Sequence, residues 1–164
     1  MNLIVNNTPA AGDTRRADDA DVLTQVAALC TRQGKKGTKV LVVKSSRGRW
    51  ILPKGWPMDD CTDAQAAKRE AWEEAGVQKG TIGKTPVGSY LTQKRFDDGR
   101  VSPCLVTVYP LAVKSMTNTY PEAGMRRRKW MSVGKAIKKL DDPGLVTLLL
   151  RLYGPLKKSR RKDA

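Results

Sequence analysis

Runs of apolar residues separated by polar turns predict a chain built mainly from strands. The run over 23–31 and the β-branched run over 39–44 are joined by a Gly/Lys turn, and a later pair of runs is joined at Asp97-Asp98-Gly99, a sequence typical of hairpin turns. Strands are therefore predicted over residues 23–31, 39–44, 49–52, 82–93, 101–113 and 129–131.

Helices are predicted in the middle and at the end of the chain. Thr62 and Gln65 have the spacing of a capping box, so a helix should start there and run to Ala75, with Gly76 directly after its end. Helical periodicity returns over 133–140 and 144–153. Several strands combined with these helices predict an α/β (α+β) fold.

The apolar pattern begins and ends within the chain, and this divides the chain into a central domain with a segment on either side. Residues 1–20 lack an apolar period and are predicted to be a flexible N-terminal arm, while 155–164 are a basic tail. One domain over 21–154 fits a chain of 164 residues. The chain has no internal repeat.

Composition narrows the functions that the chain can have. Thirty-one Lys and Arg against sixteen Asp and Glu give a net charge of +15, which predicts a polyanionic partner. The absence of histidine excludes catalytic triads and metal sites that need imidazole. Three dispersed cysteines form no CxxC pair, and no apolar stretch approaches the roughly 20 residues of a membrane span. We therefore expect a cytoplasmic protein with no membrane contact.

Three carboxylates crowd one turn of the central predicted helix. Glu70, Glu73 and Glu74 fall at i, i+3 and i+4, where like charges repel by about 0.2 to 0.5 kcal/mol per pair. A compensating cation is expected, either Arg69 or a metal, and oxygen ligands favour Mg2+ or Mn2+. The alternative is an ordinary solvated helix face on which Lys68 and Arg69 form surface salt bridges.

The surrounding residues favour the metal. Gly55, five residues, Cys61, seven residues and then Arg69-Glu70-Ala71-Trp72-Glu73-Glu74-Ala75-Gly76-Val77 resemble the Nudix box, G-x5-E-x7-R-E-U-x-E-E-x-G-U. Every glycine and charged position matches except Cys61, which replaces the first Glu. The resemblance implies a Nudix-type α/β/α sandwich with a mixed β-sheet and hydrolysis of a diphosphate linkage.

Residue roles follow from the same resemblance. It implies that Glu70 and Glu74 are metal ligands, that Glu73 is the general base or a further ligand, and that Arg69 orients the carboxylates. It also implies that the Lys54 carbonyl coordinates metal. With Cys61 in place of a carboxylate, the number of metal ions stays open, as does the identity of the base.

Three further stretches, over 40–55, 88–95 and 126–140, resemble the diphosphoinositol polyphosphate phosphohydrolase branch of the family. This likeness implies a set of substrate-binding residues, and the residues beside Gly55 would line the phosphate loop. The set is Ser45, Ser46, Arg47, Lys54, Gly55, Trp56, Arg95 and Arg126.

We therefore predict a metal-dependent Nudix pyrophosphohydrolase acting on diphosphoinositol polyphosphates, diadenosine polyphosphates or both. The substrate would be a polyanionic small molecule. One alternative is hydrolysis of nucleoside triphosphates, capped RNA or ADP-ribose-like compounds. A second alternative is a Nudix-fold module that has lost catalysis and binds nucleic acid or another polyanion. The sequence does not predict the oligomeric state.

Overall fold

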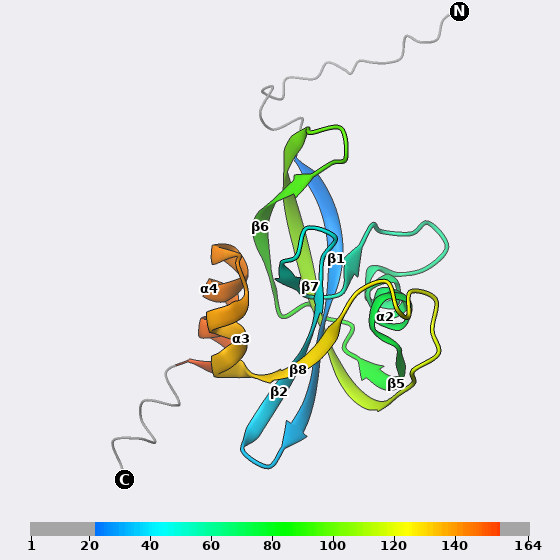
Figure 1. The fold of residues 1–164 in the computed structure, drawn as a ribbon, viewed down its shortest axis with the longest axis vertical. Coiled ribbons are helices and arrows are strands. Elements are labelled where there is room, and N and C mark those ends of the chain that lie inside the picture. Colours follow the sequence, from blue (N-terminus) through cyan, green and yellow to red (C-terminus); the bar gives the residue numbers. More distant parts are fainter. Residues whose placement is uncertain (1–21, 155–164) are drawn as a thin grey trace, which may run out of the picture.

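The computed structural model describes residues 22–154, so the predicted N-terminal arm and basic tail lie outside the described residues. Figure 1 shows the sheet with helices on either side of it. In chain order the elements are β1 (Leu23–Gly34), β2 (Gly37–Lys44), β3 (Trp50–Ile51), β4 (Lys54–Gly55), α2 (Asp63–Ala75), β5 (Val77–Ile82), β6 (Gly88–Arg95), β7 (Val101–Met116), β8 (Arg128–Ser132), α3 (Val133–Lys139) and α4 (Pro143–Tyr153).

All the strands belong to one mixed sheet. The main path runs β3-β2-β1-β7-β5, while β4 pairs with β1, β6 with β7 and β8 with β2. Strands β1 and β7 are parallel, with Leu23 opposite Cys104 and Thr31 opposite Ala112, and the other pairs are antiparallel. The long pairing of β1 with β7 forms the centre of the sheet (Figure 1).

Helices cover both faces of this sheet, which confirms the predicted α/β/α sandwich. On one face α2 contributes small side chains such as Ala67 and Ala71 to a core with Val26 and Leu41. On the other face α3 and α4 complete a second core, in which Leu148 is fully buried. The two helical layers lie on opposite sides of the sheet in Figure 1. Within residues 22–154, no helix is both long and apolar enough to span a bilayer.

The ends of α2 follow the sequence signals. The Thr62 hydroxyl accepts a hydrogen bond from the Gln65 amide, and the Gln65 side chain accepts one from the Thr62 amide. Gly76 ends the helix with a φ of 72°, a left-handed conformation that favours glycine. This capping fixes where the helix begins and therefore which face each glutamate occupies.

The single strand predicted over 82–93 is wrong. β5 pairs with the second half of β7 and ends at Ile82, opposite Leu111, whereas β6 starts at Gly88, opposite Val108. The intervening residues 83–87 carry the chain from one pairing to the next along the same 16-residue strand. The prediction also missed β4, because Lys54 and Gly55 were expected in a loop and instead pair with Ala27 and Val26.

Candidate functional site

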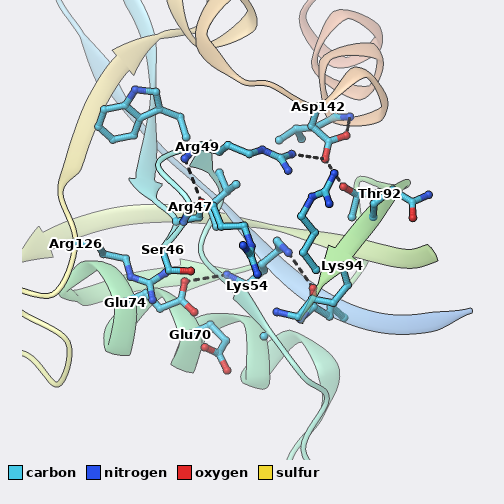
Figure 2. Close-up of a pocket in the computed structure, with 18 of the residues that line it drawn as sticks. Ser46, Arg47, Arg49, Lys54, Glu70, Glu74, Thr92, Lys94, Arg126 and Asp142 are labelled. Atoms are coloured by element: carbon cyan, nitrogen blue, oxygen red, sulfur yellow. Dashed lines mark hydrogen bonds and ion pairs between the residues drawn. The ribbon is translucent and has the colours of Figure 1, made fainter. Parts of the chain in front are cut away.

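A cavity of about 340 Å³ opens where the β2–β3 turn, β4, α2, β6 and the start of α4 meet. Figure 2 shows the side chains that converge on it. Most of the residues predicted to bind metal or substrate line this cavity. They are Ser45, Ser46, Arg47, Lys54, Gly55, Trp56, Glu70, Glu74, Arg95 and Arg126.

Two predicted residues do not line the cavity. Glu73 is half-buried on α2, and its backbone carbonyl accepts a hydrogen bond from the Glu122 amide at 3.0 Å. The Arg69 guanidinium donates to the Met58 sulfur at 3.1 Å and lies 4.0 Å from the Asp60 carboxylate. The structure therefore turns Arg69 towards the loop before α2.

Glu70 and Glu74 form a buried carboxyl pair on the face of α2 that borders the cavity. Only 9% of Glu70 and 8% of Glu74 is exposed. Burial, and then the neighbouring Glu70 carboxylate, raise the pKa of Glu74 to about 8. Burial also raises the pKa of Glu70. A pair of this kind needs a proton or a cation between its oxygens to relieve the repulsion.

Strand β4 holds this pair in place. The Lys54 amide donates a hydrogen bond to Glu74 Oε1 at 3.2 Å. A Cβ atom on Gly55 would overlap the Glu70 carboxylate, with Oε1 at 2.8 Å and the other carboxyl atoms closer still. Glycine at position 55 therefore leaves the space that the Glu70 carboxylate occupies, and a larger residue would push that side chain away.

The donor set fits a hard divalent cation. Mg2+ usually binds through one or two carboxylates together with water and substrate phosphate oxygens, and Glu70 and Glu74 offer such a pair at the cavity wall. Over residues 22–154, no three Asp, Glu or Cys side chains converge on one point. Cys61, which replaces the first glutamate of the box, packs partly buried against the core under α2 and does not line the cavity.

Basic side chains from separate elements face the carboxyl pair. Lys54 Nζ donates to Gln25 Oε1 at 2.9 Å, and burial, followed by the nearby charge of Lys94, lowers the pKa of Lys54. The Arg126 guanidinium lies 3.3 Å from Glu122 Oε1. Figure 2 shows Lys54 between the carboxyl pair and the end of the cavity at which Arg49 and Asp142 lie. Lys54, Lys94 and Arg126 therefore give this side of the cavity a positive charge that attracts anions.

The turn between β2 and β3 presents two of the predicted phosphate contacts. Ser45 Oγ accepts hydrogen bonds from the amides of Arg47 at 3.3 Å and Arg49 at 3.1 Å, so this hydroxyl stabilises the turn. Ser46 and Arg47 are exposed on the turn. Arg47 Nη2 donates to the Phe96 carbonyl at 3.2 Å, which links the turn to the end of the β6–β7 hairpin.

Sequence reasoning missed part of the lining. Arg49, Lys94 and Thr92 lie in stretches that were singled out for other residues, and Asp142 lies 93 positions from Arg49 in the chain. The Asp142-Pro143 pair is a signal for a helix start, which gave no reason to expect this carboxylate in the cavity. The missed lining residues are Gln25, Arg49, Trp50, Ile51, Tyr90, Thr92, Gln93, Lys94, Asp142 and Leu145.

Comparison with known families agrees with the geometry. The family model described as the NUDIX domain matches residues 23–151. Nudix hydrolase 16, mitochondrial, from Arabidopsis thaliana is 35% identical over 119 residues, which span 70% of this chain and 65% of the relative. Human diphosphoinositol polyphosphate phosphohydrolase 3-alpha is 34% identical over 132 residues, or 78% of this chain and 75% of the relative.

A solved structure gives the same fold. A binary complex of the C. elegans Ap4A hydrolase superimposes with a TM-score of 0.61 at 21% identity, covering 83% of this chain and 98% of that one. The chain spans 51% to 65% of the length of three plant relatives, the Arabidopsis Nudix hydrolases 16, 13 and 12.

Proposed function

Because the chain belongs to the Nudix family of hydrolases, we propose that it is a divalent-metal-dependent pyrophosphohydrolase that cleaves a diphosphate linkage in a densely phosphorylated substrate. The observation that carries this proposal is the buried Glu70–Glu74 pair at the wall of a cavity with basic side chains on its other walls. In this proposal the carboxylate pair binds the metal ion, and the surrounding Lys and Arg side chains bind the phosphates of the substrate.

The chain's own residues supply binding, orientation and charge. Glu70 and Glu74 would hold Mg2+ or Mn2+, which neutralises phosphate charge and makes bound water a better nucleophile. Lys54 on β4 and Arg126 in the segment before β8 both line the cavity and would balance the remaining negative charge of the substrate. The hydrogen bond from the Lys54 amide to Glu74 would keep the metal-binding carboxylate and the phosphate-binding lysine at a fixed distance from each other.

The number of basic residues supports a substrate with many phosphates. Arg47, Arg49, Lys54, Lys94, Arg95 and Arg126 all line one cavity. We propose diphosphoinositol polyphosphates or diadenosine polyphosphates as the substrate class. The names of the human relative and of the C. elegans structure support these two chemistries. The cytoplasmic location expected from the sequence stays a prediction.

A substrate panel tests the proposal. Release of phosphate or nucleotide would be measured with Mg2+ or Mn2+ for diphosphoinositol polyphosphates, diadenosine polyphosphates, ADP-ribose and nucleoside triphosphates. We expect metal-dependent turnover of the first two classes and its loss in Glu74→Gln. Turnover confined to ADP-ribose or nucleoside triphosphates would favour the alternative substrates. Binding of polyanions with no turnover of any substrate would contradict the proposed activity.

The role of Glu73 needs a separate variant, because its side chain does not line the cavity. If Glu73 is the general base, Glu73→Gln lowers kcat and leaves the affinity for Mn2+ unchanged. Glu70→Gln, in contrast, should weaken Mn2+ binding in an equilibrium titration. Full activity of Glu73→Gln would remove Glu73 from the chemistry.

A further inference from the structure

Arg49 lies at the end of the cavity opposite the carboxyl pair. Figure 2 shows its side chain reaching from the β2–β3 turn towards Asp142, while Glu70 and Glu74 lie on α2 at the other end, beyond Lys54. Arg49 Nη2 donates to the Asp141 carbonyl at 2.9 Å and lies 3.9 Å from Asp142 Oδ2. The guanidinium therefore crosses from the sheet to the α3–α4 connection.

Asp142 is an unusual residue for the wall of an anion-binding cavity, because it is a buried carboxylate. Only 8% of the residue is exposed, and its side chain accepts hydrogen bonds from the Thr92 hydroxyl and, at 3.5 Å, from the Leu145 amide. One carboxylate thus joins β6, the first turn of α4 and Arg49. The Asp141 carbonyl, through a hydrogen bond, and this carboxylate, through the ion pair at 3.9 Å, hold Nη2 of the guanidinium on the same side.

The Arg49 guanidinium has donors left over. Nε is buried and has no hydrogen-bond partner, with the nearest carboxylate oxygen, Asp141 Oδ2, at 3.9 Å. Within residues 22–154, no acceptor pairs with Nη1 either. Because Nε is buried, an oxyanion that enters the cavity would bind the guanidinium at Nη1.

We propose that Arg49, positioned by Asp142, forms a second anion subsite that binds a phosphate group remote from the bond that is cleaved. This inference rests on the proposed function and deepens it, because a remote subsite selects substrates that carry further phosphates beyond the diphosphate. Lys54 lies between the two ends, where the charges of Lys94 and Asp142 both act on it. Arg49 touches substrate, whereas Asp142 acts through Arg49.

A double-mutant cycle tests the subsite without turnover. Binding of inositol hexakisphosphate in EDTA would be measured by calorimetry at fixed salt for wild type, Arg49→Gln, Asp142→Asn and the double variant. We expect Arg49→Gln to weaken binding by about tenfold or more, the usual effect of losing a charge-assisted contact. Asp142→Asn should weaken binding in wild type and have no effect in the Arg49→Gln background.

Controls separate positioning from general electrostatics. Asparagine also caps helices, so Asp142→Asn should preserve α4, which the thermal midpoint checks. Asp59→Asn removes the same charge from an exposed residue outside the cavity, and Lys129→Gln removes a positive charge outside the cavity. If Asp142→Asn tightens binding in both backgrounds, Asp142 only repels the anion and its positioning role is overturned. If Arg49→Gln binds no more weakly than Lys129→Gln, the subsite itself is overturned.

Kinetics provide the second readout. With Mg2+, Arg49→Gln should raise KM for diphosphoinositol pentakisphosphate by about tenfold and raise KM for a diadenosine polyphosphate, which carries fewer phosphates, by a smaller factor. Equal effects on both substrates would contradict a remote subsite. A wild type without turnover would overturn the proposed function alone, because the binding cycle still decides the role of Arg49.

Discussion

At the residue scale, Glu74 makes the stability of the metal-free protein depend on pH. Its pKa is raised from 4.5 to about 8, so the folded chain binds a proton more tightly than the unfolded chain does. The stabilising effect of this proton is complete below about pH 4.5 and is lost as the pH rises towards 8. The buried carboxyl pair therefore costs stability at neutral to alkaline pH unless a cation replaces the proton.

We expect Glu74→Gln to reduce this loss of stability. In EDTA, the thermal midpoint of the variant relative to wild type should increase between pH 5 and pH 8 and then level off, because glutamine stays neutral. Differential scanning fluorimetry across that range measures the difference. Asp59→Asn, which changes an exposed carboxylate, serves as the control. A constant difference at all pH values would contradict the raised pKa.

Gly55 offers a second residue-scale prediction. Alanine at this position would push the Glu70 carboxylate away, because the added Cβ overlaps it. We expect Gly55→Ala to weaken Mn2+ binding by about tenfold or more, which is about 1.4 kcal/mol or greater, while the chain still folds. Mn2+ titration with thermal unfolding measures both effects.

A compensating variant distinguishes displacement of Glu70 from a general defect. Glu70→Asp shortens the side chain by one methylene, so the shorter carboxylate should leave room for the methyl group that Gly55→Ala adds. The Gly55→Ala/Glu70→Asp double variant is therefore expected to bind Mn2+ no more weakly than Glu70→Asp alone. Additive losses would show that Gly55→Ala acts through the backbone of β4.

At the scale of elements, local signals predicted α2 better than they predicted the strands. The capping pair Thr62 and Gln65 and the terminal Gly76 act within one turn of the chain, so the sequence contains all the information that places the helix ends. The strand predicted over 82–93 failed because the division depends on which half of β7 each segment pairs with. Gly83 and Pro86 within that stretch were the available sign of a break.

The difference between local signals and long-range contacts also decides which residues of the cavity could be predicted. The glutamates of α2 and the turn residues Ser45 and Arg47 could be predicted from spacing and from the family resemblance. Arg49 and Asp142 could not be predicted in this way. Arg49 contacts Asp141 and Asp142, which lie 92 and 93 positions away in the chain, and the packing of α4 against β6 brings them together. An Arg at a strand start and an Asp at a helix start each have an adequate local explanation.

At the scale of the whole molecule, the net charge of +15 should govern how fast a polyanion reaches the cavity. Raising NaCl from about 0.05 to 0.5 M shortens the screening length from more than 10 Å to a few ångström. We expect kcat/KM for diphosphoinositol polyphosphates to fall steeply over this range while kcat at saturation stays nearly constant. Diadenosine polyphosphates, with fewer charges, should show a shallower slope in the same assay at fixed Mg2+. Equal slopes would mean that the cavity residues alone attract the substrate, since only long-range attraction by the whole molecule scales with the total charge of the ligand.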